Sequence, residues 1–365
     1  MDDFDRDVYC LAGLPFDVLD MQGALRIITA AAQNRSRCFL STPNLNFLIT
    51  SHKDLEFWDS VIHSDLVVAD GMPLVWLAKL LRIPLRVRVA GSSLFEAMHE
   101  LDSSKPISVY LFGGPDGVAE LAAQRINQAR DGLTCVGYQS PGFVSVEEMS
   151  TDSRIDQINA SKADFLVVSL GAKKGQSFIY NNLSRIQVPI VSHLGAVVNF
   201  EARILRRAPV LIQNLGLEWL WRIKEEPGLW RRYWNDGLGL LKLLFSTILP
   251  FSLWLMLNRR RLLASLSKCD VHLECDDKLC RLKIVGVVLD PVVPCIRDAM
   301  RKASQQNADV MLDLANAEYL SPGFFGLLLM LKKHLDAKAM KFKVVGVQPE
   351  IQKLIKWNGL LDLVK

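Results

Sequence analysis

Short apolar runs alternate with amphipathic stretches over the first 215 residues of the chain. The apolar runs predict β-strands at residues 38–41, 66–69, 108–112, 133–138, 165–170 and 190–193, with residues 8–11 as a further candidate. Between them, apolar positions at helical spacing predict helices at residues 21–33, 46–51, 73–80, 93–100, 117–129 and 175–182. This alternation favours an α/β fold, with a Rossmann-like, mostly parallel sheet and helices on both faces.

Two regions of different amino-acid composition follow this α/β stretch. Residues 195–233 interleave arginine and tryptophan, which indicates either a helical appendage on lipid or diphosphate or a helix with its tryptophans packed inside. Residues 237–257 are almost entirely apolar and long enough to span a bilayer. Because basic clusters flank both ends, we expect an interfacial helix pair or a re-entrant hairpin bent near Pro250, rather than a spanning helix or an oligomer interface.

The remaining sequence predicts a second, smaller α/β unit. Strands are expected at residues 271–275, 278–285, 310–314 and 341–347, and helices at residues 293–306, 323–334 and 349–358. This part has no glycine-rich phosphate turn and no cluster of His, Asp and Glu, so we interpret it as a binding or regulatory module. The predicted domains are residues 1–235, an apolar membrane-associated segment and basic linker at 236–265, and residues 269–365.

Charge and cysteine content narrow the class of protein. The net charge is only +4, but residues 201–262 hold eleven Lys and Arg against five acids. A basic belt beside apolar sequence suits anionic lipid or phosphate better than nucleic acid. Seven cysteines without a CxxC pair predict reduced thiols in a cytoplasmic protein, and the acidic start of the chain lacks a signal-peptide pattern.

Polar residues follow two of the predicted strands. Asp70 comes where strand 66–69 ends in a Gly-Pro turn, and Thr42, Asn44 and Asn46 follow strand 38–41. Ligands of open α/β sheets bind at this edge, so the two turns suggest one cleft with Asp70 as its only acid and the candidate general base. The alternative is that Asp70 only caps the turn after it.

Two glycine-containing turns are candidates for phosphate binding. One follows strand 108–112 and contains Gly113 and Gly114; the other follows strand 165–170 and contains Gly171, Lys173, Lys174 and Gln176. Glycines let a phosphate approach the backbone closely, and lysines and helix N–H groups meet its charge. Arg88 and Ser92 are further polar groups on an early turn. Neither turn matches a dinucleotide or ATP motif, and ordinary tight turns are the alternative.

The first 235 residues resemble the WecG/TagA/CpsF family of bacterial glycosyltransferases, through an ordered set of short motifs. The set comprises Thr42-Pro43-Asn44, Val68-Ala69-Asp70-Gly71-Met72-Pro73, Gly113-Gly114, Pro141-Gly142-Phe143, Gly171-Ala172-Lys173-Lys174-Gly175-Gln176, Arg207-Ala208-Pro209 and Gly216-Leu217-Glu218-Trp219 with Arg222. The resemblance implies an inverting, metal-independent enzyme without a cofactor. Such an enzyme transfers a sugar, such as N-acetylmannosamine or its uronic acid, from a UDP-sugar to an undecaprenyl-diphosphate-linked acceptor in cell-surface polysaccharide synthesis. Its place is the cytoplasmic face of the membrane.

The resemblance also assigns roles to residues. Asp70 and Thr42 fall on the catalytic positions, and Gln176 is the best match for a polar donor ligand. Arg222 and either Arg231 or Arg232 fall on arginines implicated in binding the lipid diphosphate. The donor set that we expect is Asn44, Asn46, Arg88, Gly113, Gly114, Gly171, Lys173, Lys174 and Gln176.

The last 95 residues or so resemble a STAS domain. The match lies in residues 310–314 and in the following Glu318-Tyr319-Leu320-Ser321-Pro322-Gly323, where Ser321 occupies the phosphorylatable position of STAS regulators. The resemblance implies a regulatory or docking role and a protein partner. The rival hypothesis for the whole chain is therefore a non-catalytic, membrane-associated STAS scaffold.

Overall fold

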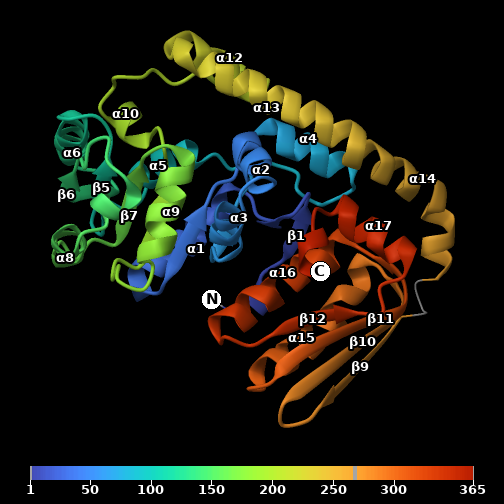
Figure 1. The fold of residues 1–365 in the computed structure, drawn as a ribbon. Coiled ribbons are helices and arrows are strands. Elements are labelled where there is room, and N and C mark those ends of the chain that lie inside the picture. The colour runs from blue at the N-terminus through green and yellow to red at the C-terminus, as the bar shows by residue number, and fades with distance from the viewer. Residues whose placement is uncertain (1, 266–268, 365) are drawn as a thin grey trace. The chain divides into compact units, whose positions relative to one another are not determined.

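The computed structural model describes residues 2–265 and 269–364, which form two compact units. The larger unit comprises Leu19–Val75 and Val87–Gly237. The smaller unit draws its described residues from Met1–Val18, Trp76–Arg86 and Leu238–Lys365. Each unit is therefore assembled from stretches that are distant in the sequence, and Figure 1 shows the elements along the chain.

The larger unit is built on a six-stranded sheet in the order β4-β3-β8-β7-β5-β6. Every pairing within this sheet is parallel. The strands are β3 (Cys38–Ser41), β4 (Leu66–Val67), β5 (Ile107–Gly113), β6 (Leu133–Gln139), β7 (Phe165–Ser169) and β8 (Ile190–His193). The predicted mostly parallel sheet is thus confirmed.

Helices cover both faces of this sheet because alternate strand residues point to opposite sides. On one face, Val167 packs with residues of α1, α5, α6 and α10. On the other face, Leu166 and Val168 pack with residues of α7, α8 and α9. The helices of the unit are α1 (Met21–Asn34), α2 (Leu45–Ser51), α3 (Leu55–Ile62), α5 (Gly91–His99), α6 (Val118–Ala129), α7 (Val146–Met149), α8 (Asp152–Ala160), α9 (Ala172–Asn182), α10 (Val197–Glu201), α11 (Val210–Asn214) and α12 (Glu218–Glu225).

The smaller unit has a four-stranded sheet in the order β12-β11-β10-β9. Its elements are β9 (Asp270–Cys275), β10 (Leu279–Val288), α15 (Val293–Gln305), β11 (Asp309–Leu320), α16 (Pro322–Ala337), β12 (Phe342–Val345) and α17 (Pro349–Trp357). Strand β9 runs antiparallel to β10, and the other pairs are parallel. The second α/β unit is therefore present as predicted, with β11 extending six residues beyond the expected end at residue 314.

The chain's beginning belongs to this smaller unit. Strand β1 (Val8–Leu11) pairs with β2 (Leu14–Asp17) in a two-stranded hairpin, and not with the parallel sheet. The hairpin lies against α16 so closely that a Cβ on Gly326 would come within 2.1 Å of the Val8 carbonyl oxygen. The backbone of β1 therefore requires glycine at this point of the helix.

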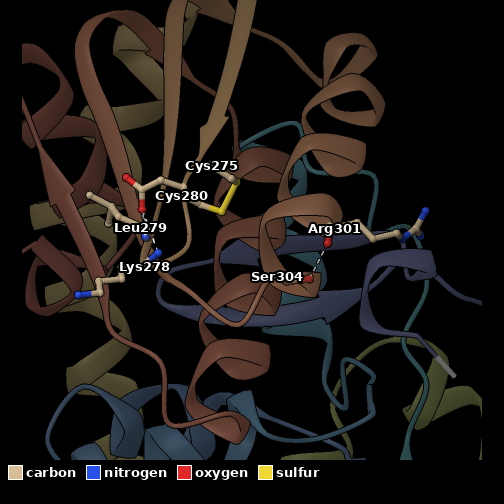
Figure 2. Close-up of a disulfide and its surroundings, with 7 residues drawn as sticks. Cys275, Lys278, Leu279, Cys280, Arg301 and Ser304 are labelled. Carbon is tan, nitrogen blue, oxygen red and sulfur yellow. Dashed lines mark hydrogen bonds between the residues drawn. A yellow bond between two sulfur atoms is a disulfide. The ribbon is translucent and has the colours of Figure 1, made fainter.

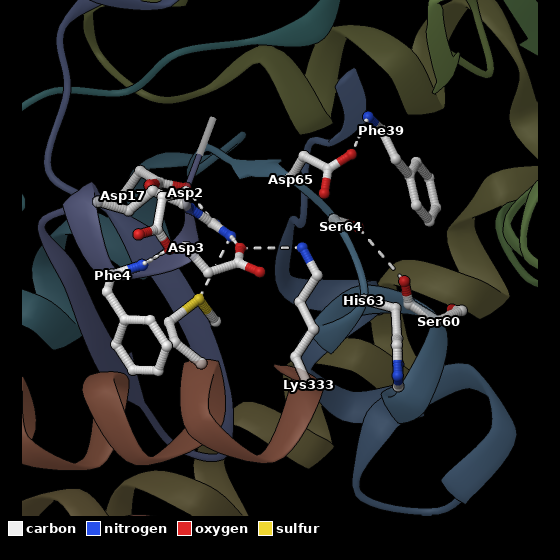
Figure 3. A network of polar contacts seen from close by, with 12 residues as sticks. Asp2, Asp3, Phe4, Asp17, Phe39, Ser60, His63, Ser64, Asp65 and Lys333 are labelled. Atoms are coloured by element: carbon white, nitrogen blue, oxygen red, sulfur yellow. Dashed lines mark hydrogen bonds and ion pairs between the residues drawn. The ribbon is translucent and has the colours of Figure 1, made fainter. Parts of the chain in front are cut away.

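A buried charged network holds the hairpin and its flanks. The Arg6 guanidinium contacts Asp17 at 2.7 Å and Asp3 at 2.8 Å, and its own side chain is 1 % exposed. Lys333 of α16 donates to Asp3 at 2.9 Å (Figure 3). The carboxylates of Asp3 and Asp17 balance the Arg6 charge, which would be costly to bury alone.

The apolar segment forms a helix without the expected hairpin. Helical structure continues from Pro227 to Ala264, through α13 (Trp230–Leu243), a π-helical turn at Leu244–Ile248 and α14 (Leu249–Ala264). Pro250 lacks an N–H and its ring crowds the carbonyl four residues earlier. The wider π turn directly before it accommodates both defects, so the chain does not turn back at Pro250.

One face of α14 packs inside the smaller unit. Phe251 stacks on Trp357 of α17 with ring centroids 5.6 Å apart, and Trp254 stacks on Tyr319 at 5.7 Å. Leu253, Met256 and Leu257, which lie on the opposite side of the helix, are more than half exposed. The helix thus has two apolar faces, of which the unit covers one.

Two of the seven cysteines form a disulfide, which corrects the prediction that all are reduced thiols. Cys275 ends β9 and Cys280 lies opposite it in β10, and their sulfur atoms are bonded (Figure 2). The pairing escapes a search for CxxC because the turn between the strands separates the two residues by five positions. Of the other cysteines, Cys10, Cys38 and Cys135 are buried, Cys269 is half-buried and Cys295 is exposed.

Candidate active site

The ends of β3 and β4 bring Thr42 and Asp70 to the same edge of the sheet. The two strands are parallel neighbours, and the Asp70 N–H donates to the Pro43 carbonyl at 2.8 Å. Gly91, the first residue of α5, donates its N–H to Asp70 Oδ2 at 3.2 Å. A Cβ on Gly91 would lie 3.1 Å from Thr42 Oγ1 and 2.6 Å from Leu194. Glycine at residue 91 therefore lets α5 approach both polar residues.

The Asp70 carboxylate is in a partly buried, charged environment. Burial raises its pKa from 3.8 to about 6, although the positive charge of Arg88 acts in the opposite direction. Arg88 lies 2.7 Å from Glu218 of α12, so part of its charge is already balanced. A carboxylate with a pKa near 6 is largely ionised at neutral pH and remains basic enough to accept a proton.

The two glycine turns meet where the direction of the sheet connections reverses. Strands β5 and β7 are neighbours, but the chain continues from β5 to β6 on one side and from β7 to β8 on the other. Nucleotides bind open α/β sheets at such switch points. Gly114 donates its N–H to the Ser169 carbonyl at 3.0 Å, which holds the two turns together. Gly171 precedes α9 and has open space where a Cβ would stand.

The polar residues of the second glycine turn point to several places. Lys173 pairs with Asp54 at 2.6 Å, and Lys174 donates to the Val144 carbonyl at 3.1 Å; both lysines are exposed. Gln176 is fully buried and donates to Ser41 Oγ at 2.6 Å. The structure therefore places Gln176 inside the unit, where it is hydrogen-bonded to the last residue of β3.

The two asparagines after β3 both stabilise helices. Asn44 caps α2 by accepting a hydrogen bond from the Phe47 N–H at 3.2 Å. Asn46 donates to Asp236 of α13 at 3.0 Å, and both residues belong to the larger unit. These bonds fix the polar turn that carries Thr42.

The three arginines expected to bind the lipid diphosphate differ in their surroundings. Arg222 pairs with Glu226 and lies 5.4 Å from the centre of the Phe200 ring. Arg231 and Arg232 lie over the rings of Trp230 and Tyr233, and both arginines are exposed. Arg222 is thus directed toward α10, whereas the other two guanidinium groups remain on the surface of α13.

A hollow of about 540 Å³ beside α5 contains residues that were not expected in the site. Its wall includes Arg203, Arg206 and Arg207, of which Arg207 donates to Ser93 Oγ at 2.8 Å and pairs with Glu96. The positive charge of Arg207 also acts on Asp70 and lowers its pKa. This effect is smaller than those of burial, Arg88, Glu218 and the Gly91 hydrogen bond. The Arg207-Ala208-Pro209 motif marks this position in the sequence, but the motif alone does not indicate a role for Arg207 near Asp70.

Ser321 of the smaller unit is 2 % exposed. It caps α16, since its Oγ accepts from the Phe324 N–H at 3.3 Å. The adjacent Asp290 carboxylate is also hydrogen-bonded to Ser321, and burial raises the Asp290 pKa. A regulatory role for Ser321 would require this helix end to open.

His193 and the acidic residues complete the survey of the site. His193 is buried, its Nε2 lies 2.8 Å from the Leu170 carbonyl, and burial lowers its pKa. These contacts give His193 a structural role. Over residues 2–265 and 269–364, no group of three or more His, Cys, Asp or Glu is placed to hold a metal ion.

Comparison with known proteins identifies both parts of the chain. The model of the glycosyl transferase WecG/TagA/CpsF family matches residues 9–252, and that of the Mlab STAS domain matches residues 271–365. An N-acetylglucosaminyldiphosphoundecaprenol N-acetyl-beta-D-mannosaminyltransferase of Bacillus spizizenii is 25% identical over 213 residues, which cover 56% of this chain and 81% of the relative. A protein of the same name from Staphylococcus aureus strain MRSA252 is 24% identical over 217 residues, 58% of this chain and 82% of the relative.

The first family match covers more than half of the chain, and it includes the sheet edge that carries Thr42 and Asp70. The order of motifs, the parallel sheet and the relatives agree with one another. The chain therefore belongs to the WecG/TagA/CpsF family of glycosyl transferases and carries a C-terminal STAS domain.

Proposed function

We propose that this protein transfers N-acetylmannosamine or a related sugar from a UDP-sugar to a sugar linked to a polyprenyl diphosphate. The acceptor class is supported by the relatives, which are named for acting on an undecaprenyl-diphosphate-linked N-acetylglucosamine. The single observation that carries the reaction is the Asp70 carboxylate at the strand edge, with a pKa raised to about 6 beside Thr42 and Arg88.

In this mechanism Asp70 accepts the proton of the acceptor hydroxyl as its oxygen attacks the anomeric carbon of the donor. The bond between that carbon and the UDP oxygen breaks on the opposite side, and UDP leaves with the electron pair. The configuration of the transferred sugar is thereby inverted. Thr42, next to Asp70 through Gly91, would hold the attacking or the transferred sugar by its hydroxyl.

The leaving diphosphate is met by backbone N–H groups instead of a metal ion. The turns after β5 and β7 offer Gly113, Gly114 and Gly171 at the switch point of the sheet, and Gly171 is followed by the first N–H groups of α9. N–H groups at a helix start stabilise negative charge without any rearrangement during the reaction. Lys173 and Lys174 are close in sequence and would add positive charge once their present bonds are exchanged.

We place the protein at the cytoplasmic surface of the membrane, where a polyprenyl-linked acceptor would be available to it. The helix Pro227–Ala264 is apolar and long enough to cross a bilayer, but the smaller unit covers one side of α14 with Trp357 and Tyr319. A helix covered in this way fits the interface better than the bilayer interior. Its free face, with Leu249, Leu253 and Met256, would enter the lipid, and Arg259–261 would contact anionic headgroups.

The decisive experiment is turnover of radiolabelled UDP-N-acetylmannosamine on a short-chain polyprenyl-diphosphate N-acetylglucosamine by the full-length protein. We expect lipid-linked disaccharide and free UDP in equal amounts, unchanged by EDTA. A panel of other UDP-sugars then identifies the preferred donor. Loss of activity in EDTA would contradict the metal-independent mechanism, and absence of turnover with every donor would favour the STAS scaffold.

A further inference from the structure

The hollow beside α5 has the charge of an anion site. It lies wholly in the larger unit, and Arg203, Arg206, Arg207, Glu96 and Glu201 are part of its wall. Each of the two acids already has a basic partner: Glu96 pairs with Arg207, and Glu201 lies 3.3 Å from His99. Within the described residues the guanidinium groups of Arg203 and Arg206 form no ion pair. Two positive charges in this hollow are therefore uncompensated.

Arg207 supplies a further unused donor. Its Nη atoms bond Glu96, Ser92, Ser93 and Gln213, but its Nε is buried without a hydrogen-bond partner. A buried N–H without an acceptor is costly, and an oxygen of a bound anion would satisfy it. Arginine is also the residue best suited to bind phosphate groups through two parallel hydrogen bonds.

The hollow begins next to the proposed catalytic base. Gly91 donates its N–H to Asp70, and Ser92, the next residue, lines the hollow and accepts from Arg207 at 3.5 Å. The residue that bonds Asp70 and a residue that lines the hollow are thus adjacent in the chain, so an anion bound in the hollow would lie near the proposed base.

We propose that this hollow binds the diphosphate of the polyprenyl-linked acceptor through Arg203, Arg206 and Arg207. The inference rests on the proposed function, which it extends by naming a site for the acceptor. The donor diphosphate keeps its separate proposed site at the glycine turns after β5 and β7, at the switch point of the sheet.

The connection of the hollow to the appendage favours the acceptor over the donor. Trp221 of α12 donates its Nε1–H to the Arg206 carbonyl at 2.9 Å, and Arg222 shares the Phe200 ring with Arg207. Helix α12 leads along the chain into α13 and the apolar helix that we propose for the membrane surface. The hollow is thus hydrogen-bonded to the helix that continues along the chain toward the proposed membrane segment, which favours the lipid-linked acceptor as its ligand.

The test uses Arg206→Gln and Arg203→Gln, with Arg26→Gln on α1 as the matched control. Both pocket side chains are exposed and unpaired in the described structure, so neither change removes a contact needed for folding; Arg26 is an exposed arginine elsewhere in the same unit. Calorimetric titration of the full-length protein with farnesyl diphosphate, farnesyl monophosphate and UDP distinguishes binding at the acceptor diphosphate site from binding at the donor site. We expect each pocket variant to bind farnesyl diphosphate about tenfold more weakly, as loss of one charge-assisted bond predicts.

The remaining results of this titration decide the proposal. UDP affinity is expected to stay as in the wild type, and the preference for diphosphate over monophosphate is expected to shrink in the variants. Unchanged farnesyl diphosphate binding in both variants, or a loss of UDP affinity instead, would overturn the proposal. Because binding is measured without turnover, an arginine-dependent farnesyl diphosphate site in a protein that transfers no sugar would contradict only the proposed function.

Discussion

Replacing Asp70 by Asn removes both a base and a buried negative charge, so activity and stability are expected to change in opposite directions. Asparagine cannot accept the acceptor proton, and a positioned general base contributes about 10²–10⁴-fold to a rate. We therefore expect sugar transfer to fall by about that factor, while UDP binding is retained because the nucleotide site that we propose lies at the β5 and β7 turns. In the wild type, kcat/KM should fall as pH drops through about 6, where Asp70 takes up its proton.

The effect on stability follows from the same pKa. The folded protein holds the Asp70 proton up to about pH 6, whereas the unfolded chain releases it near 3.8, so folding becomes less favourable as pH rises between these values. The whole pKa difference corresponds to about 3 kcal/mol in the free energy of unfolding, and the wild type loses about half of this between roughly pH 5 and pH 7.5. Asp70→Asn does not have this loss, so its free energy of unfolding relative to the wild type should rise by about half of that amount over this pH range.

Urea unfolding at the two pH values measures this change, with Asp156→Asn as the control because Asp156 is an exposed acid on α8 of the same unit. The control variant should keep wild-type activity and show no pH-dependent gain. Wild-type turnover by Asp70→Asn, or a pH–rate profile that stays flat well below 6, would refute the assignment of Asp70 as base.

Three further predictions concern the other parts of the chain. Arg6→Ala should lower the free energy of unfolding by about 3–5 kcal/mol, since it leaves the Asp17 carboxylate buried without its partner; a loss below about 1 kcal/mol in urea unfolding would contradict this. Ser321→Ala should cost about 1 kcal/mol through loss of the helix cap, and Ser321→Asp should cost more because Asp290 faces it; equal melting temperatures of the two variants would argue against this contact. Leu253→Asp should reduce cosedimentation with phosphatidylglycerol vesicles about tenfold, whereas Leu55→Asp, at a residue that is 62% exposed on α3, should not; equal loss in both variants would exclude a specific role for α14.

The sequence predicted the parallel sheet well because its strands are buried runs bounded by turns. Residues 38–41 and 190–193 match β3 and β8 to the residue. The run at 8–11 is also a strand, but its partner β2 contains Pro15, which hides it as a strand in a sequence search. The turn between the two is made by Ala12 and Gly13, both at positive φ, and Ala12 gives no signal of that conformation.

The position of Asp70 after a predicted strand made it a candidate base, but the sequence did not indicate which residues influence its pKa. Gly91 is 21 residues away from Asp70, and the Arg88–Glu218 pair joins residues 130 positions apart. Such contacts depend on how α5 and α12 pack in the folded unit, which local periodicity does not encode. Gln176 illustrates the opposite case, because its place in a motif indicated a ligand while the fold directs its side chain inward.

The Cys275–Cys280 pair was missed for a related reason. Cross-strand pairs depend on the register of a hairpin, and here Asp276 sets the turn by accepting from the N–H groups of Lys278 and Leu279. Register cannot be read from the number of residues between two cysteines alone. The π turn before Pro250 could not be predicted from the sequence either. The proline indicated a break in the helix, but the sequence did not show that a π turn would let the helix continue.

The placement of the N-terminal hairpin also has a consequence during synthesis. Arg6 bonds Met330 of α16, which leaves the ribosome 324 residues later, and at about 5–20 residues per second this interval is on the order of tens of seconds. During that time Phe4, Val8 and Leu11, all buried in the finished protein, have no helix to cover them. This early segment therefore waits for most of the chain before it can reach its native contacts, and the nascent chain is expected to need a chaperone until α16 appears.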